Sequence, residues 1–544
     1  MACDRNYTVG TPSTMTLALR RMLVAVFFIG SIPMAVANDS ESAEALRVGR
    51  ITIYAIPLFD AAEVRQGSFY RAANLLHVQT RAALVRQFLL FREGDRYDPV
   101  RLEETERNLR QVDFLKSASV TAGTPHEGIV DITVVTQDVW TTDINGDFSN
   151  DGGKAAYAVD VTQKDLFGSG SELELHLGTG IERRANTIEF LHPAIFGPYW
   201  SLDTLYSRNS DGNEQKLELD RPLFSYSTPW SMSFLFDHDL RNARTFREGE
   251  VAARFRQEHR ELSLSRSHVL KSDPGGSSRL VGGVDLIDDS FDNFPDRPGD
   301  LIPASRRFRF IDAGYESTAF HFEKLDYVDR DLREQDFNLG RFGSIHAGLS
   351  PRLSAGRQLT WRLRAAEGLG HAFGARSFLI GQMSVSTRAP RDRNQVISGD
   401  VRWVTRFETR YPQSFVARAR LDLGWNLDRD TQFLADGQSG LRAYPDFAFE
   451  GGRRFIFNAE HRIFLGREIL QIFGPGAAVF VDSGQAVDGD LRLGGMKTDV
   501  GVGLRLGMAR FESALIRVDL AYALNASPLN RRGTVVSIST VQAF

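Results

Sequence analysis

Apolar and polar residues alternate along most of the chain after residue 140. In residues 415–427, apolar residues occupy the odd positions, and Arg418, Arg420 and Asp422 lie between them. The same period of two recurs in residues 173–177, 359–365, 500–506 and 518–524. Such a period is typical of β-strands, because their successive side chains point to opposite faces. Residues 141–544 are therefore predicted to form a mainly β structure of antiparallel strands.

The arginines on the polar face indicate which face of these strands could contact lipid. An arginine or lysine on the lipid side at mid-membrane costs roughly 2–4 kcal/mol, so we expect the charged face to line a wet lumen. A mean hydropathy of −0.25 suits a membrane barrel, in which only alternate residues face lipid. A soluble β-sandwich also alternates but rarely has such long strands. The pattern favours a transmembrane β-barrel.

Residues 47–140 have a different pattern, which predicts a small α+β domain. A weakly alternating strand comes first, over residues 47–56, and a helix capped by Thr80 is expected after it. Asp98 followed by Pro99 predicts the start of a second helix. Two short strands are then expected at residues 117–121 and 129–136. Residues 57–79 remain ambiguous.

The N-terminal segment has the pattern of an export signal. Two arginines precede an apolar run over residues 22–34, and an Ala-Val-Ala triplet ends at Ala37. The alternative is a membrane anchor, but the uncharged stretch is shorter than the roughly 20 residues that a spanning helix needs. We predict a signal peptide over residues 1–37 and a linker over residues 38–46.

Composition and motif searches exclude several classes of function. The net charge of −4, from 65 basic and 69 acidic residues, gives no indication of a nucleic-acid partner. The single cysteine, Cys3, lies within the predicted signal peptide, so the mature chain would have no disulfide or thiolate site. The stretch Gly168-Ser169-Gly170-Ser171-Glu172 does not complete the G-x-S-x-G motif, and H-E-x-x-H is absent. We therefore expect no enzyme activity, catalytic residue or cofactor.

Two other features allow more than one interpretation. The acidic stretch 288–293 reads as an external loop; calcium binding there is conceivable but lacks the EF-hand spacing, so a solvated loop is favoured and no metal site is predicted. The aromatic residues in 196–200 and 229–230 suit a girdle at a membrane interface. They suit packing beside turns almost as well.

A set of motifs near the C-terminus predicts an ion pair in the lumen. A loop carries Arg442 and Tyr444, and a later strand carries Phe480 and Asp482. Glu460 lies on the strand between them, and by alternation both acidic side chains fall on the polar face. An arginine in a partly desolvated lumen needs a partner, which a carboxylate can supply through a bidentate pair.

These motifs resemble those of the BamA-type outer-membrane assembly and translocation superfamily, the bacterial surface antigen barrels. That family carries Arg-Gly-Tyr or Arg-Gly-Phe in its sixth external loop, and Ala443 replaces the glycine here. The C-terminal Phe544 resembles the family's last-strand signal, and residues 91–98 resemble part of a POTRA domain. The resemblance implies a barrel of sixteen strands, a lumen lock formed by Arg442 with its partners, and a seam between the first and last strands that opens sideways.

The resemblance also implies a function. It places the barrel in the outer membrane of a Gram-negative bacterium, with the single POTRA-like domain, residues 47–140, in the periplasm. The expected partners are outer-membrane lipid and extended client polypeptides, which would bind the POTRA-like domain and the seam during insertion or translocation. Accessory lipoproteins stay undetermined. The alternative function is a passive channel or a structural surface barrel without polypeptide clients.

The export pattern makes a direct prediction about the mature N-terminus. If the peptide is cleaved after Ala37, mass spectrometry of the protein from membranes will find Asn38 as its first residue. A mature protein that retains residues 22–37 would contradict export by a cleaved signal.

Overall fold

The structure is a computed structural model of the 544-residue chain. It describes residues 46–59, 64–65, 67–112, 114–151, 154–180, 183–197, 199–296, 299–325, 328, 335–351, 359–389, 393–466, 469, 473–508, 515–527 and 533–539. The predicted signal peptide and Phe544 lie outside these residues. Within the described part, no helix is long and apolar enough to cross a membrane.

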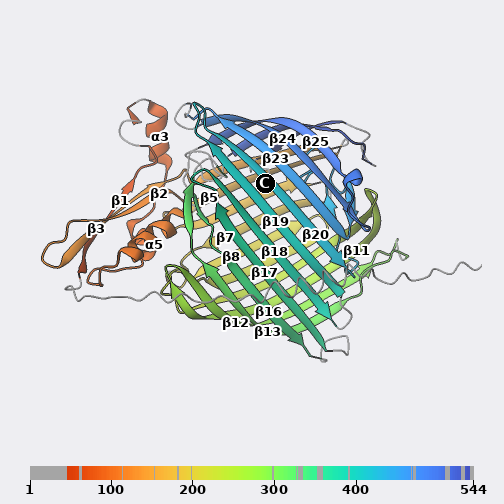
Figure 1. The fold of residues 1–544 in the computed structure, drawn as a ribbon, viewed down its shortest axis with the longest axis horizontal. Helices are drawn as coiled ribbons and strands as arrows, with labels where there is room; N and C mark the ends of the chain where they lie inside the picture. Colours follow the sequence, from red (N-terminus) through yellow and green to blue (C-terminus); the bar gives the residue numbers. More distant parts are fainter. Residues whose placement is uncertain are drawn as a thin grey trace, which may run out of the picture. The chain divides into compact units, whose positions relative to one another are not determined.

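Most of the described residues form one closed antiparallel β-barrel, so the predicted fold class is confirmed (Figure 1). Its strands, in chain order, are β4 (Thr142–Asp151), β5 (Lys154–Leu166), β6 (Ser171–Thr179), β7 (Arg184–His192), β8 (Ser201–Asn209), β9 (Gly212–Arg221), β10 (Trp230–Arg247), β11 (Glu250–Asp273), β12 (Gly276–Asn293), β13 (Arg306–Ala319), β16 (Phe342–Ser350), β17 (Thr360–Ala372), β18 (Ser377–Ala389), β19 (Arg393–Phe407), β20 (Gln413–Trp425), β23 (Arg453–Phe464), β24 (Phe473–Val487), β25 (Lys497–Met508), β26 (Leu515–Ala523) and β27 (Thr534–Ser539). We call the end of the barrel at which β4 begins the N-proximal end, and the other the distal end.

The number of strands differs from the sixteen that the resemblance implied. Among the described residues, twenty strands follow one another in the closed sheet. Alternation repeats in the same way in every strand, so it does not fix how many strands a barrel contains. That number depends on the stagger and tilt with which the sheet closes. The expected count of sixteen is therefore wrong for this chain.

The barrel closes where its last strand meets its first. Between the described residues, β27 pairs with β4 at only two positions, Ser537 with Ser149 and Ile538 with Phe148. The other junction of β27, with β26, has six paired positions. The β27–β4 junction is therefore the least extensively paired one in the described barrel, and we refer to it as the seam.

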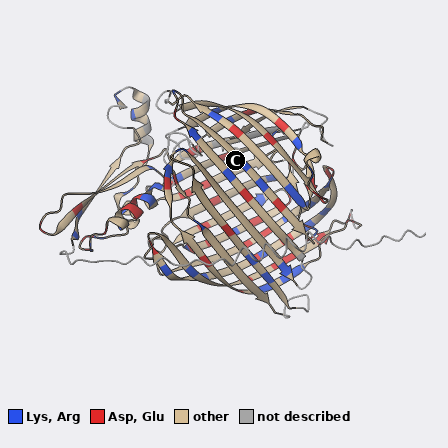
Figure 2. Ribbon diagram, viewed as in Figure 1, with Lys and Arg blue, Asp and Glu red and all other residues tan. Residues whose placement is uncertain are grey.

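The two faces of the strands divide as predicted, with apolar side chains outward and charged side chains inward. Leu177, Val502 and Leu504 point away from the barrel and are 59%, 53% and 66% exposed. Charged residues are spaced along the strands with uncharged residues between them (Figure 2). An exposed apolar belt of this extent is stable against lipid and unfavourable against water.

The acidic stretch 288–293 is not the external loop that was expected. It is the distal end of β12, paired with β11 and β13. Asp289 points into the barrel, where its carboxylate accepts hydrogen bonds from His259 (2.6 Å) and Arg306 (2.7 Å). Phe291 is buried against Phe255. These partners on other strands make the segment a strand despite its turn-rich composition.

Residues 46–138 form a separate three-stranded sheet with helices. The elements are β1 (Arg47–Ile56), α3 (Ser68–Leu76), α4 (Ala82–Gln87), α5 (Pro99–Arg110), β2 (Leu115–Ala122) and β3 (Ile129–Asp138). The strand order is β1-β3-β2, with β1 parallel and β2 antiparallel to β3. Apolar side chains of α4 and α5 pack on this sheet, including Leu84, Val85 and Leu109.

Of the two helix caps predicted in this domain, one is confirmed and one is wrong. Asp98 caps α5 as predicted, because its carboxylate accepts a hydrogen bond from the Val100 N–H at 3.0 Å. Thr80 does not cap α4; the capping position is Arg81, and the Thr80 hydroxyl instead donates to Asp165 at 2.8 Å. Helix α3 occupies part of the segment that the sequence left ambiguous.

Helix α5 contacts two connections at the N-proximal end of the barrel. Buried Glu104 accepts hydrogen bonds from the Tyr226 N–H (2.7 Å) and the Ser225 hydroxyl (3.2 Å), in the connection between β9 and β10. Arg110 donates to both oxygens of Asp336 at 3.0 Å. Asp336 lies in β15 (Gln335–Asn338), which pairs with β14 (Phe322–Leu325).

The Glu104 contact should depend on pH. Burial raises the pKa of Glu104 above its ordinary value of 4.5 and outweighs the hydrogen bonds from Tyr226 and Ser225, which lower it. The buried position as a whole therefore favours the protonated carboxyl. A raised folded-state pKa means that this stabilisation is complete below about pH 4.5 and is lost as the pH rises through the raised value. We predict that the free energy of unfolding, measured by denaturant at a series of pH values, falls over that rise. Glu104→Gln, which stays neutral, should remove the pH dependence; an unchanged pH profile in that variant would contradict the assignment.

Candidate functional site

A long loop between β20 and β23, residues 426–452, folds into the barrel lumen. It contains a small ribbon of β21 (Phe433–Ala435) and β22 (Phe449–Gly451). Its apolar side chains pack against inward-facing residues of the wall; the cluster comprises Ala435, Leu441, Ala443, Tyr444, Ala448, Ile456, Phe480, Ala486, Ala521 and Ala523. The loop therefore has a core of its own inside the barrel.

A turn around Asp436 shapes the loop before it reaches Arg442. The Asp436 carbonyl accepts hydrogen bonds from the Gly440 and Leu441 N–H groups at 3.1 and 2.8 Å. Its carboxylate accepts from the N–H groups of Ser439 and Phe447, each at 2.9 Å. Gly440 has a φ of 124°, a backbone conformation that favours glycine. The turn directs the following residues toward β23 and β24.

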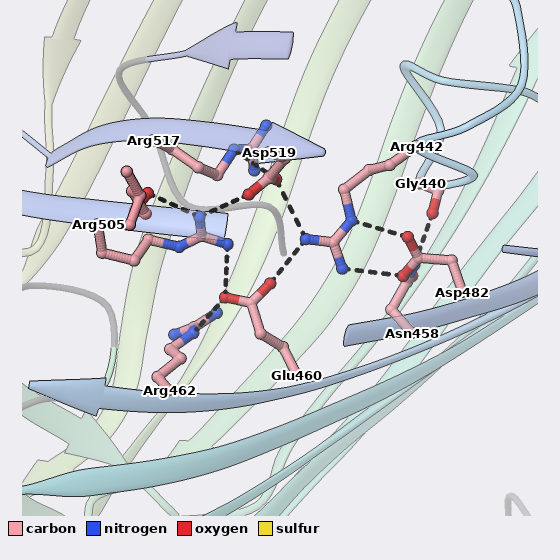
Figure 3. A network of polar contacts seen from close by, with 10 residues as sticks. Gly440, Arg442, Asn458, Glu460, Arg462, Asp482, Arg505, Arg517 and Asp519 are labelled. Atoms are coloured by element: carbon pink, nitrogen blue, oxygen red, sulfur yellow. Dashed lines mark hydrogen bonds and ion pairs between the residues drawn. The ribbon is translucent and has the colours of Figure 1, made fainter. Parts of the chain in front are cut away.

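Arg442 is the centre of the site. Its Nε and Nη2 donate to the two oxygens of Asp482 at 2.7 and 3.0 Å, which forms a bidentate pair (Figure 3). Its Nη1 donates to Glu460 at 2.7 Å and to Asp519 at 3.3 Å. Arg442 is 7% exposed, and all three carboxylates are fully buried. One guanidinium from the loop thus joins β23, β24 and β26.

Phe480 supplies the surface on which this guanidinium lies. The Arg442 Cζ is 3.4 Å from the centre of the Phe480 ring, a cation–π arrangement. Gly501 lies opposite Phe480 in the sheet, and a Cβ added at Gly501 would come within 2.2 Å of the ring. The ring therefore occupies space that exists only because its neighbour is glycine.

The ion pairs extend beyond Arg442 into a buried cluster. Glu460 also accepts hydrogen bonds from Arg462 (2.9 Å) and Arg505 (3.0 Å), and Arg505 donates to Asp519 at 2.6 Å. Asp499 lies directly opposite Asp482 in the sheet and is fully buried. We call the following eight residues the lumen cluster: Arg442, Arg462, Arg505, Arg517, Glu460, Asp482, Asp499 and Asp519. Four arginines face four carboxylates, so the formal charges cancel.

Asn458 and Tyr444 hold the loop on either side of the arginine. The Asn458 side-chain amide donates to the Gly440 carbonyl at 2.7 Å and to Asp482 at 2.8 Å. The Tyr444 hydroxyl lies within hydrogen-bond distance of the carbonyls of Thr498 (3.0 Å) and Asn525 (3.3 Å). The loop is thus connected to β23 on one side and to the ends of β25 and β26 on the other.

The alanine that replaces the family's glycine fits the loop without strain. Ala443 is fully buried, and its φ is not positive. Positive φ values in the loop occur instead at Asn426 (50°), Gly440 (124°) and Phe447 (64°). The backbone at position 443 therefore does not require a glycine.

The structure brings together all five described residues that the motifs singled out, namely Arg442, Tyr444, Glu460, Phe480 and Asp482. Phe544 lies outside the described residues. The motifs missed Asn458 and the other members of the lumen cluster. The signal for Arg505, Arg517 and Asp519 was available, because each lies on the charged face of an alternating strand. Alternation alone does not show which of the many inward charges meet.

Among the described residues, no group of three or more histidine, cysteine, aspartate or glutamate side chains is arranged to hold a metal ion. The chemistry of the site is therefore that of buried ion pairs and hydrogen bonds. These contacts can hold a loop in place.

Neither comparison by sequence found a relative. No protein-family model matches the chain. No curated protein matches it either.

The comparison with solved structures found several similar chains. CdiB from Acinetobacter baumannii is similar at 13% identity with a TM-score of 0.45, covering 96% of each chain. CdiB from Escherichia coli is similar at 12% identity with a TM-score of 0.45, covering 97% of each chain. BamA from Haemophilus ducreyi lacking POTRA domains 1–3 is similar at 12% identity with a TM-score of 0.38, covering 91% of this chain and 84% of that one. BamA-type proteins are thus among the structures that this chain resembles, and its activity must be argued from its own residues.

The buried pair of Arg442 and Asp482 should show energetic coupling. Removing one partner leaves the other charged group buried, so we predict that Arg442→Ala lowers the free energy of unfolding by about 3–5 kcal/mol. Asp482→Ala should act on the same interaction, and the double variant should lose less than the sum of the two. A double-mutant cycle by denaturant unfolding in detergent micelles measures this coupling.

Arg256→Ala provides the control for that cycle. Arg256 is exposed and forms no ion pair with a described residue, so its replacement should change the unfolding free energy by no more than about 0.5 kcal/mol. Additive effects of Arg442→Ala and Asp482→Ala would show that the two residues do not act as a unit.

Proposed function

We propose that this protein is an outer-membrane barrel that assists the insertion or translocation of other polypeptides, with its N-terminal domain in the periplasm. The observation that carries the proposal is the seam, at which β27 and β4 pair at two positions between the described residues. Unpaired backbone groups are costly in lipid, so a strand edge exposed at the seam would favour pairing with an incoming strand. The N-proximal end of the barrel would then face the periplasm.

The N-terminal domain has an edge that could bind an extended client. In the described part, β2 pairs with β3 on one side and with no strand on the other. An extended polypeptide can add to such an edge through main-chain hydrogen bonds, whatever its sequence. This arrangement supports the interpretation of residues 47–140 as a POTRA-like domain that contacts clients.

The lumen cluster has a defined place in this mechanism. It connects β23, β24, β25 and β26, and β26 is next to the last strand, β27. Ion pairs across these four strands would keep this part of the wall rigid while the seam opens. We therefore propose that Arg442, Tyr444, Glu460, Phe480 and Asp482 form a lumen lock.

Passive conduction is a second candidate function. It is favoured by charged side chains on the inner wall that remain partly accessible, such as Lys216 and Glu218 in β9, each 32% exposed at the side chain. A wet, charged lumen could conduct small ions. Planar-bilayer conductance with unchanged client levels after depletion would favour this candidate over the first.

A disulfide across the seam tests the leading proposal. Ser149 and Ser537 are paired residues on β4 and β27, and the mature chain is expected to have no other cysteine. We predict that Ser149→Cys with Ser537→Cys, once oxidised, abolishes the insertion of client barrels into proteoliposomes and that reduction restores it. Seam opening would be blocked by the covalent bond.

The control disulfide joins Leu520→Cys and Val536→Cys, which are paired one junction away between β26 and β27. This pair should leave insertion unchanged, because the seam stays free. If the seam disulfide and the control have the same effect, the seam does not open during the reaction.

A further inference from the structure

A second cluster of arginines lies on the outer face of the barrel at its N-proximal end. Arg221 is the last residue of β9 and Trp230 the first of β10, and Arg266 lies on β11. The Cζ of Arg221 is 3.9 Å from the centre of a Trp230 ring, and that of Arg266 is 5.1 Å from it. Two guanidinium groups thus share one tryptophan.

The register of the strands shows that this cluster faces outward. Met232 pairs with Arg221 on one side and with Arg266 on the other. The next outward positions along these strands are apolar, namely Leu219, Phe234 and Leu264. Arg221 and Arg266 therefore lie at the N-proximal edge of the lipid-facing belt, on the side of the N-terminal domain.

The surrounding aromatic residues indicate the level of a membrane interface. Trp200 contacts Trp230 edge-on at 6.3 Å between ring centres, and Phe196 contacts Trp200 in the same way at 6.3 Å. Tryptophan is enriched where lipid head groups meet the apolar core. This contact favours the interfacial interpretation of residues 196–200 and 229–230 over simple packing beside turns.

What distinguishes these two arginines is that they share one tryptophan at the edge of the apolar belt and have no acidic partner among the described residues. Two outward arginines near the distal end are paired with acids: Arg307 donates to Asp288 at 2.8 Å, and Arg260 forms an ion pair with Glu258. Arg256, also outward and near the distal end, forms no ion pair with a described residue, but it does not lie beside tryptophan at the edge of the apolar belt. Arg221 and Arg266 form no ion pair with a described residue, and Arg266 is exposed. Cationic groups at the edge of an apolar belt are unfavourable unless an anion or water reaches them. The protein does not provide that anion.

We propose that Arg221, Trp230 and Arg266 form a binding site for the phosphate group of an anionic glycerophospholipid in the periplasmic leaflet. The two Cα atoms are separated by two strand spacings, about 10 Å, so long arginine side chains can converge on one phosphate between them. Guanidinium groups bind phosphate oxygens with directed, often bidentate hydrogen bonds. The adjacent apolar belt would hold the acyl chains.

The space beside Arg266 is consistent with a bound lipid phosphate. Gly282 pairs with Arg266 on the next strand, and a Cβ added at Gly282 would approach nothing closer than the Asp312 carbonyl at 4.0 Å. On the β12 side of Arg266, the paired residue therefore contributes no side chain to the outer face. The inference requires the barrel to span a membrane, but it does not require a polypeptide client.

Native mass spectrometry of the full-length mature protein in detergent tests the proposal, with phosphatidylglycerol and phosphatidylethanolamine as competing probes. The wild type should retain phosphatidylglycerol with at least about ten-fold preference, because each arginine near a head group contributes to anion binding. Arg221→Gln with Arg266→Gln should reduce that preference to near unity. Arg256→Gln, an exposed arginine on the same outward face near the distal end of β11, should leave it unchanged.

Several results would overturn the proposal. Equal retention of the two lipids by the wild type would do so, however the variants fold. So would a preference that survives in the double variant or is lost equally in Arg256→Gln. A competition with excess inorganic phosphate completes the test. If free phosphate displaces the lipid, the site binds anions in general and is not a lipid site. Heat-modifiable migration on gels confirms that each variant retains a folded barrel.

Discussion

The structure depends on how a guanidinium is accommodated away from water. Moving an ion into the protein interior costs several kcal/mol even after relaxation, and this cost is met only when good hydrogen bonds surround the ion. Arg442 has these bonds because Asp482, Glu460 and Asp519 converge on it from three strands. The loop that carries Arg442 is consequently fixed inside the barrel, and the strands that carry the carboxylates are fixed to one another.

The same physical constraint explains the two uses of arginine in this barrel. Inward arginines are buried among carboxylates of matching number, as in the lumen cluster, where the formal charges cancel. Among the outward arginines, Arg307 is paired with an acid near the distal end, and Arg221 lies at the edge of the apolar belt beside tryptophan. Each arrangement avoids leaving a charge in contact with lipid tails.

The strands joined by the lumen cluster lie close to the seam, where the strands are least extensively paired. The lumen cluster connects β23 to β26, whereas the junction one strand further along, between β27 and β4, is paired at two described positions. A wall that is stiff on one side of a poorly paired junction would confine any opening to that junction. This contrast is the physical basis for proposing a barrel that handles polypeptides over one that is uniformly closed.

The sequence by itself determined those features that depend on local chemistry. Alternation fixed which residues face outward, since each strand residue points opposite to its neighbour. Asp98 and Pro99 located the start of α5, because a cap acts on the N–H groups of the next few residues. The motif around Arg442 indicated its partners Glu460 and Asp482, since a buried arginine requires carboxylates and alternation showed which ones face inward.

Only the tertiary structure decided features that depend on closure and register. Twenty described strands close the barrel where sixteen were expected. Arg505 and Asp519 join the cluster because β25 lies beside β24 and β26 lies beside β25 in the closed sheet. The acidic residues 288–293 are a strand because His259 and Arg306 on neighbouring strands meet Asp289. The Thr80 hydroxyl donates a hydrogen bond to Asp165 on β5, and does not cap α4, for the same reason. In each case the deciding partner is distant in sequence, and its position is set by how the whole sheet closes.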